Sequence, residues 1–237
     1  MTVLVTGSGG YLGRHVVALL RESGVEFSTT SPSGADLTDA LDVRALLRAT
    51  APSKIIHCAA VVPKNGAGYS DGLAAAQSLA MVRNLAEFAT YPITFASSMA
   101  ATYATGGYGR GKLLAERVLL GREHSGDVVI RLPGLFGAPR KSGVLYNAAV
   151  AFLTGQPFTL EPQTGPWAAM DVRDAAACMV SGVYDGPTEP MDIHGAVSLV
   201  AMYAGIASGH GGTFPELFAR RVAELVEWVR QDLAVAV

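Results

Sequence analysis

Tyr108 and Lys112 are the residues whose types and spacing most directly indicate proton-transfer chemistry in this sequence. They stand four positions apart at the start of a helix predicted over residues 113–120, and residues four apart share a helical face, so the phenol and the ammonium can occupy one small volume. A free phenol has a pKa of about 10, and a nearby cation favours its phenolate form. Such a phenol can give a proton to a carbonyl oxygen as hydride arrives, or take one from an alcohol as hydride leaves. Ser98, which follows a predicted strand, would hydrogen-bond the same oxygen.

A glycine-rich turn near the start of the chain predicts a nucleotide site. Residues 3–5 are apolar and β-branched or leucine, as in a buried parallel strand, and the chain then passes Gly7, Gly10 and Gly13 around the start of a helix predicted over residues 11–20. Gly7 permits backbone angles that a side chain forbids, Gly10 lets a pyrophosphate approach, and Gly13 lets the helix lie close to the strand. The first-turn N–H groups then point at the ligand. The spacing differs by one residue from G-x-G-x-x-G, and a tight structural turn is the alternative interpretation.

The end of the second predicted strand, over residues 25–31, bears on the choice of cofactor. An acidic side chain there would bond the adenosine ribose hydroxyls and select NAD. Thr30 and Ser31 stand there instead, with Arg14 as the nearest plausible cation, so the sequence favours NADP over NAD. Asp36, which precedes a predicted helix cap, is a candidate functional carboxylate, and a turn residue is the alternative interpretation.

Small and polar residues follow two further predicted strands. A strand over residues 54–60 ends in Ala59 and Ala60, and a strand over residues 92–96 is followed by Ser98 and Met99. Parallel α/β sheets bind their ligands at the carboxyl ends of the strands, where small side chains leave space for a flat molecule. These residues are therefore expected at the same edge of the sheet as the glycine turn.

The order of elements predicts an α/β fold with a Rossmann-type doubly wound parallel sheet. We expect an NAD(P)-binding domain over residues 1–140 and a small C-terminal substrate lobe over residues 141–237, partly interleaved with the Rossmann core. The remaining predicted helices and strands cover residues 41–48, 73–90, 127–132, 142–163, 167–183 and 214–233, and residues 187–212 are predicted to be rich in turns.

Composition excludes several classes of protein. Half of the 237 residues are hydrophobic, only 16% are charged, and the net charge is −2 without a basic run, so neither a disordered chain nor a nucleic-acid partner is expected. There is no charged n-region and no apolar run of membrane-spanning length, so we expect no membrane partner and a cytoplasmic location. Cys58 and Cys178 are expected to be reduced core thiols. His57 is expected in the core, and His194 and His210 lack a second ligand at metal spacing, so no metal site is predicted.

Taken together, these motifs resemble the extended short-chain dehydrogenases/reductases, the NAD-dependent epimerase/dehydratase family of sugar-nucleotide enzymes. The matching motifs run in the family's order and are Thr6-Gly7-x2-Gly10-x2-Gly13, Asp36-Leu37, residues 57–60, Ser97-Ser98, residues 108–116, residues 131–137 and residues 170–174.

The resemblance implies a role for each motif. Asp36 and Leu37 would contact the adenine, Lys112 would bond the nicotinamide ribose and assist Tyr108, and Pro133 to Leu135 would pass beside the nicotinamide. The expected catalytic residues are Ser98, Tyr108 and Lys112, and the expected substrate contacts are Met99 and Trp167. The expected cofactor-binding residues are Gly7, Gly10, Tyr11, Leu12, Gly13, Arg14, Thr30, Ser31, Asp36, Leu37, Ala59, Ala60, Lys112, Pro133 and Leu135.

Departures from the family pattern narrow the reaction. Met99 and Ala100 stand where family dehydratases carry an Asp-Glu pair, which argues against a dehydratase. Trp167 stands where many epimerases hold the substrate diphosphate with an arginine. The segment between Ser98 and Tyr108 is short, which leaves Ser97 as an alternative to Ser98.

The resulting prediction is an NAD(P)H-dependent ketoreductase that acts on a sugar-like ketone, a nucleotide-activated 4-keto-deoxysugar, with Tyr108 as the acid. An NAD-dependent sugar epimerase, a reductase of a non-sugar natural-product ketone, and a dinucleotide-binding regulator with a vestigial catalytic set remain alternatives. The resemblance also implies a homodimer that packs the helices of residues 73–90 and 108–120.

Overall fold

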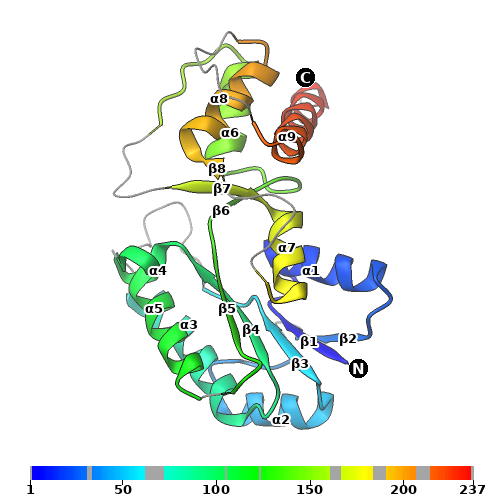
Figure 1. The fold of residues 1–237 in the computed structure, drawn as a ribbon, viewed down its shortest axis with the longest axis vertical. Coiled ribbons are helices and arrows are strands. Elements are labelled where there is room, and N and C mark those ends of the chain that lie inside the picture. The colour runs from blue at the N-terminus through cyan, green and yellow to red at the C-terminus, as the bar shows by residue number, and fades with distance from the viewer. Residues whose placement is uncertain are drawn as a thin grey trace. The chain divides into compact units, whose positions relative to one another are not determined.

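The computed structural model describes residues 2–30, 34–61, 72–104, 106–122, 124–160, 167–183, 191–206 and 214–235. The chain divides into two compact units (Figure 1). The first unit comprises residues 1–132 and 176–184, and the second comprises residues 133–175 and 185–237.

A five-stranded parallel sheet forms the first unit. Its strands are β1 (Val3–Thr6), β2 (Phe27–Thr29), β3 (Lys54–His57), β4 (Ile93–Ser98) and β5 (Val128–Leu132), in the spatial order β2-β1-β3-β4-β5. From β1 the chain goes to β2 on one side and then returns to β3 on the other, so the sheet is doubly wound. This confirms the predicted Rossmann-type fold, and it places the topological switch point at the carboxyl ends of β1 and β3.

Helices cover both faces of this sheet. They are α1 (Tyr11–Glu22), α2 (Ala40–Thr50), α3 (Gly72–Phe88), α4 (Ala100–Tyr103), α5 (Gly106–Leu120) and the end of α7 (Val172–Ser181). Figure 1 shows α3 and α5 on one face and α1 on the other. Beneath α2, α3 and α5 lies a core of buried apolar side chains: Leu4, Ile55, Ile93 and Phe95 from the strands and Val43, Leu47, Val82, Leu85, Ala115 and Leu119 from the helices.

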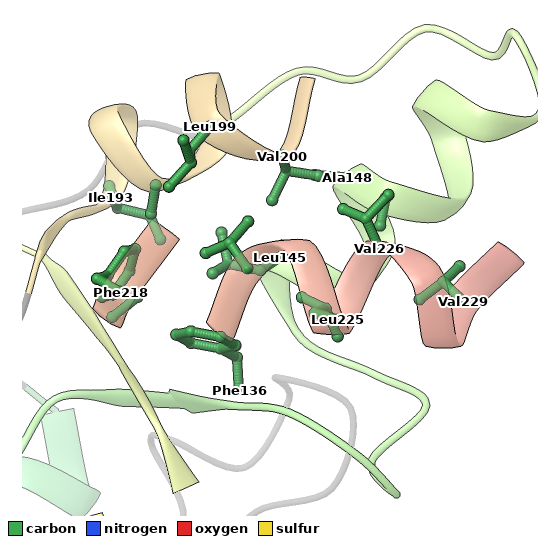
Figure 2. Packing of buried hydrophobic residues seen from close by; sticks show 14 residues of the cluster. Phe136, Leu145, Ala148, Ile193, Leu199, Val200, Phe218, Leu225, Val226 and Val229 are labelled. Carbon is green, nitrogen blue, oxygen red and sulfur yellow. The ribbon is translucent and has the colours of Figure 1, made fainter. Parts of the chain in front are cut away.

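The second unit combines a three-stranded sheet with helices. Strands β6 (Gly134–Phe136) and β7 (Ala168–Asp171) are parallel, and β8 (Met191–Asp192) pairs antiparallel with β7. The helices are α6 (Val144–Leu153), α8 (Ile193–Tyr203) and α9 (Glu216–Val235), with the start of α7. Figure 2 shows the core of this unit, where Phe136 of β6 and Phe218 of α9 make an edge-to-face contact with 5.5 Å between ring centroids, beside Leu145, Val200 and Val226.

The motif of residues 170–174 has a structural role within the second unit. Asp171 and Asp174 are buried; Arg173 donates to Asp171, and Arg221 of α9 donates to Asp174 at 3.0 Å. Glu224 of α9 pairs with Arg173 at 2.7 Å. These ion pairs fasten α9 to the segment that joins β7 to α7.

The prediction of a turn-rich segment over residues 187–212 is wrong for its described part, residues 191–206, which form β8 and α8. The Asp192 side chain accepts hydrogen bonds from the N–H groups of His194 and Gly195, and this N-cap starts the helix. Ile193, Ala196, Leu199 and Val200 are buried along one face of α8. His194 lies exposed on the first turn, and His210 lies outside the described residues.

Other boundaries shift by smaller amounts. The prediction of a helix over residues 142–163 is too long, because α6 ends at Leu153 and Gly155 takes a positive φ of 68°. Strands β2 and β3 are shorter than predicted, and α4 was not predicted. Asp39 caps α2, since its side chain accepts hydrogen bonds from the N–H groups of Leu41 and Asp42.

Candidate active site

The glycine turn after β1 is shaped by close backbone contacts. Gly7 has a φ of 70°, and a Cβ atom there would lie 2.5 Å from the Ala59 nitrogen after β3. A Cβ atom at Gly13 would lie 2.1 Å from the Gly7 carbonyl oxygen. The Gly10 N–H donates to that same oxygen at 2.9 Å. Only glycine at positions 7 and 13 allows β1, β3 and α1 to meet this closely.

The N-terminus of α1 has the features of an anion site. Its N-cap residue, Gly10, makes no side-chain cap hydrogen bond, and its first turn carries no acidic residue. The positive end of the helix dipole is therefore not offset by a carboxylate. Tyr11 and Leu12 are partly buried in this turn, with the Tyr11 ring edge-on to His15.

Thr30 closes the other side of the turn. The Gly7 N–H donates to the Thr30 hydroxyl at 3.4 Å, and the Ser8 hydroxyl donates to the Thr30 carbonyl at 3.3 Å. Arg14 is exposed on α1 and donates to the Gly9 carbonyl at 3.0 Å. Ser31, also predicted to bind the cofactor, lies outside the described residues.

Asp36 and Leu37 follow β2, and local contacts occupy their side chains. The Asp36 carboxylate accepts from the Thr38 N–H and hydroxyl, both at 2.8 Å, and these hydrogen bonds lower the pKa of Asp36. Leu37 is buried against the core of the first unit, and its carbonyl accepts from the Asn84 amide at 3.0 Å. Asp36 thus has the geometry of the turn residue that was its alternative interpretation.

The two serines at the end of β4 have different surroundings. The Ser97 hydroxyl is buried and donates to the Glu116 carboxylate of α5. The Ser98 hydroxyl is partly exposed and accepts from the Ala100 N–H at 3.2 Å. Ser98 therefore lies at the partly exposed carboxyl end of the strand. Met99 begins the turn into α4, where its N–H donates to the Leu132 carbonyl at 2.9 Å.

Tyr108 and Lys112 lie one turn apart on α5, as their spacing predicts. The Lys112 ammonium is 6.0 Å from the centroid of the Tyr108 ring and 4.7 Å from that of Phe95 on β4. It donates to the Ala96 carbonyl at 2.7 Å. Tyr108 is partly exposed, whereas Lys112 is only 5% exposed. Helix α5 comes this close to α4 because Gly109 has no side chain; a Cβ atom there would lie 2.5 Å from the Ala100 oxygen.

Burial sets the charge states around this lysine. Burial lowers the pKa of Lys112 to about 8, while the nearby Glu116 carboxylate acts in the opposite direction. Burial raises the pKa of the Cys58 thiol to about 12, so the thiol stays protonated. Cys58 and Cys178 form no disulfide, in agreement with the prediction of reduced thiols. The lysine is thus a cation whose titration lies near physiological pH.

His57, at the end of β3, is the core histidine that the sequence favoured. Its Nδ1 lies 2.6 Å from the Thr6 hydroxyl, and its ring stacks on Phe95 with 5.6 Å between centroids. Burial lowers the pKa of His57 to about 3, so the ring is neutral. Thr6, Glu116 and Arg131 lie within the motifs that carry the family resemblance, but the sequence predicted no role for them or for Phe95, although Glu116 continues the four-residue spacing of Tyr108 and Lys112.

The other expected contacts belong to the second unit. Pro133 is buried and Leu135 is partly buried. Trp167 is partly buried against the core of that unit, and its carbonyl accepts from the Ile193 N–H at 2.9 Å.

Across the described ranges, no cluster of His, Cys, Asp or Glu could hold a metal ion. The helices in the described parts of the chain are also too short or too polar to cross a membrane.

Comparison with protein families supports the interpretation of the N-terminal motifs. Residues 1–97 match the family described as RmlD substrate binding domain. A dTDP-4-keto-6-deoxy-D-glucose reductase of Streptomyces niveus is 44% identical over 57 residues, covering 24% of this chain and 20% of that protein. The methionine adenosyltransferase 2 subunit beta of Xenopus tropicalis is 30% identical over 173 residues, covering 63% of this chain and 51% of that protein. The chain thus aligns with about half or less of each of these relatives.

A solved structure matches nearly the whole chain. The UDP-glucose 4-epimerase of Thermus thermophilus, in complex with NAD, superposes with a TM-score of 0.72 at 19% identity. The match covers 97% of this chain and 99% of that one. At this level of identity the likeness concerns the fold, and it agrees with the predicted doubly wound sheet.

Proposed function

We propose that this chain, whose motifs resemble those of the extended short-chain dehydrogenases/reductases, is an NAD(P)H-dependent ketoreductase. One observation carries the proposal: the buried Lys112 ammonium lies 6.0 Å from the Tyr108 ring centroid on one face of α5. Both residues follow β4, in the sheet whose switch point lies at the glycine turn after β1. A tunable phenol near a nucleotide site is the arrangement that reversible ketone reduction requires.

The first unit fits a dinucleotide at the switch point of its sheet. The cradle formed by Gly7, Gly10 and Gly13 has no side chain that could block a pyrophosphate, and the first turn of α1 offers its N–H groups without a competing acid. Ala59 and Ala60 are small and partly exposed after β3. A bound nicotinamide dinucleotide would supply the hydride. Thr30 and Arg14, with no carboxylate among the described residues at the end of β2, favour NADP, and NAD is the alternative.

The side chains of the first unit supply the proton. Ser98 and Tyr108 would hydrogen-bond the ketone oxygen, and Tyr108 would transfer its phenolic proton to that oxygen as the carbonyl carbon accepts hydride. The products are the alcohol, the oxidised cofactor and a phenolate that solvent reprotonates. The Lys112 cation stabilises this phenolate, because an adjacent positive charge favours the ionised form. A lysine with a pKa of about 8 retains that charge through the neutral range.

The substrate class is proposed as a nucleotide-activated 4-keto-deoxysugar. The aligned relative from Streptomyces niveus, named as a dTDP-4-keto-6-deoxy-D-glucose reductase, supports this class. Met99 and Ala100 supply no carboxylate for dehydration after Ser98. Met99 and Trp167 are the proposed substrate contacts, and a non-sugar ketone is the alternative because Trp167 cannot pair with a diphosphate as arginine does.

A second candidate is an epimerase that oxidises and re-reduces one sugar carbon. The structural likeness to an enzyme named UDP-glucose 4-epimerase and solved with NAD favours it. Stoichiometric cofactor that copurifies with the protein, without net consumption, would distinguish this activity from reduction. A third candidate, a dinucleotide-binding regulator, is favoured by the alignment with a protein named as the beta subunit of an adenosyltransferase.

A homodimer is proposed through α3 and α5. Leu73, Leu114 and Leu120 are 67%, 45% and 56% exposed on these helices, an apolar surface that a second copy could cover. Sedimentation of the wild type and a Leu114→Glu variant would test it, since a charge in the interface should yield monomers.

The test of the proposed activity begins with a titration of NADPH and NADH, followed by reduced-nicotinamide fluorescence. A panel of 4-keto-deoxysugar nucleotides is then screened for oxidation of the bound cofactor. Tyr108→Phe should lower kcat by about a thousandfold while cofactor still binds, because general acid catalysis is worth roughly 10²–10⁴. The matched control is Tyr103→Phe on α4, whose side chain is 42% exposed and should not affect kcat. Full turnover by Tyr108→Phe would overturn the assignment, and binding without consumption would favour the epimerase or the regulator.

A further inference from the structure

Glu116 extends the Tyr108–Lys112 face of α5 by one more turn. Its carboxylate is almost completely buried, with 4% of the residue exposed. Burying a carboxylate destabilises the fold unless charged or polar groups satisfy its oxygens, so the groups around it indicate its role.

Two groups from neighbouring strands converge on this carboxylate. The Ser97 hydroxyl of β4 donates to Oε1. The Arg131 guanidinium of β5 forms a two-pronged pair, with Nε 2.9 Å from Oε1 and Nη2 2.6 Å from Oε2. Ser97 and Arg131 are direct neighbours in the β4–β5 register. Bidentate arginine–carboxylate pairs fix orientation as well as distance.

The same arginine reaches the segment that follows Ser98. Arg131 Nη1 lies 3.4 Å from the Thr102 hydroxyl on α4. The network of Ser97, Glu116, Arg131 and Thr102 therefore joins the ends of β4 and β5 and the short helix α4 to α5. Ser98 lies between two of these anchored residues, Ser97 and Thr102.

We propose that Glu116 is a positioning residue for the reaction proposed above, which this inference presupposes: it clamps the end of β4 that carries Ser98 against the face of α5 that carries Tyr108 and Lys112. Small displacements matter here, since a misplacement of about 1 Å can cost roughly a hundredfold in rate. The carboxylate has a second effect as the negative charge nearest in sequence to Lys112, one helical turn away.

The charged and titratable groups that face Lys112 define that second effect. They are Cys58 and His57 from β3 and its end, and Tyr108 and Glu116 from α5. Cys58 and His57 are neutral at pH 7, so among these groups Glu116 supplies the negative charge. Its loss is expected to lower the pKa of Lys112 and move the alkaline limit of activity to lower pH.

Two variants separate charge from reach. Glu116→Gln keeps the length of the side chain and removes its charge, whereas Glu116→Asp keeps the charge and withdraws it from Ser97. The matched control is Asp127→Asn, which removes the charge of another buried carboxylate paired with an arginine, Arg122, at 2.8 Å. Asp127 precedes β5 and its carboxylate accepts from the Ile93 N–H at the opposite end of β4 from Ser98.

Three quantities are measured: the pKa of Lys112, the Kd for NADPH, and the pH profile of kcat. The pKa of Lys112 is followed by NMR of ¹³C-labelled lysine, and the signal is assigned with the variant Lys112→Met. We expect Glu116→Gln to lower the pKa of Lys112 and to lower kcat at pH 8 by about tenfold or more, with less than about a twofold change in Kd. Glu116→Asp should lower kcat with the Lys112 titration retained. Asp127→Asn should lower Tm and change neither the pKa of Lys112 nor kcat.

Other outcomes overturn the inference. An unchanged Lys112 titration and kcat in Glu116→Gln would contradict it, as would equal losses in Asp127→Asn. If Glu116→Gln does not fold, Ser97→Ala, which leaves the Glu116–Arg131 pair in place, must still lower kcat without affecting the Lys112 titration. A wild type that binds NADPH but reduces no ketone would refute the proposed reductase instead, and the lysine titration would still report on the charge of Glu116.

Discussion

The Lys112 ammonium lies 4.7 Å from the centroid of the Phe95 ring, and this same ring stacks on the buried imidazole of His57. A buried cation against an aromatic face is stabilised by about 2 kcal/mol. Phe95→Leu removes that face while keeping an apolar side chain. We expect the pKa of Lys112 to fall below about 8 by roughly one unit, since about 1.4 kcal/mol corresponds to one unit. The lysine titration and the alkaline limb of the kcat profile both measure this.

The matched control is Phe27→Leu on β2, which removes another cation–aromatic contact, that with Arg21 at 5.6 Å. It should leave the Lys112 titration unchanged. If the two variants had the same effect on Lys112, the Phe95 ring would have no specific role in holding the charge.

The buried Lys112 also predicts how stability depends on pH. Its pKa is about 8 in the folded chain and near 10.5 when unfolded, so between these values the unfolded state binds more protons and stability rises with pH. The cost of burying the ammonium is fully present below pH 8 and is relieved toward pH 10.5. Lys112→Met avoids this cost at every pH. The unfolding free energy of Lys112→Met, relative to the wild type, should therefore fall by about 2 kcal/mol between pH 7 and pH 10, measured by urea denaturation.

This test has an internal check on activity. Lys112→Met should bind NADPH and reduce the ketone substrate poorly at every pH, although it is more stable than the wild type at pH 7. A difference in unfolding free energy that stayed constant from pH 7 to pH 10 would show that Lys112 does not titrate as a buried group.

Ser98 and Ser97 should respond differently to alanine. The Ser98 hydroxyl is partly exposed at the end of β4, and its loss should lower kcat by about a hundredfold, as expected when one donor to a developing oxyanion is removed. The Ser97 hydroxyl is committed to Glu116, so Ser97→Ala should lower Tm and reduce kcat by no more than about tenfold. Steady-state kinetics and thermal unfolding of both variants decide between the serines. The reverse ranking would assign the hydrogen bond to the ketone oxygen to Ser97.

The sequence predicted the sheet and the placement of Tyr108, Lys112 and the glycine turn because each depends on local signals. Apolar runs mark the strands, a four-residue spacing marks a shared helical face, and glycine marks a turn. Ser97 and Ser98 could not be separated, since the difference between them is Glu116, which lies on another element. The same reason hid Phe95, whose contact with Lys112 depends on how α5 packs on β4. Helix α8 was missed because Gly195 and Ser198, which are residue types typical of turns, interrupt its apolar sequence pattern.

The glycine turn predicts a steric requirement at Gly13. A Cβ atom there would meet the Gly7 carbonyl oxygen at 2.1 Å, so Gly13→Ala must displace the turn and should weaken NADPH binding by at least tenfold, about 1.4 kcal/mol. Gly9→Ala is the matched control, because a Cβ atom at Gly9 meets nothing within 4 Å. Fluorescence titration of both variants measures the effect. Equal affinity in the two variants would mean that the turn does not hold the cofactor.

Arg14 predicts which cofactor the chain prefers. Its guanidinium is exposed on the first turns of α1 and donates to the Gly9 carbonyl, beside the turn that Thr30 closes. A 2′-phosphate near Thr30 would form a charge-assisted pair with Arg14, whereas the hydroxyl of NADH would not. We expect Arg14→Ala to raise the Kd for NADPH by about tenfold, or about 1.4 kcal/mol, and the Kd for NADH by less than about twofold. Arg21→Ala, on the same helix but in its last turn, should change neither constant. The loss in Arg14→Ala should also shrink in high salt, because an exposed pair is screened. The prediction would be wrong if the wild type bound NADH more tightly than NADPH and Arg14→Ala changed neither Kd. The absence of an acidic residue after β2 would then not determine the choice of cofactor.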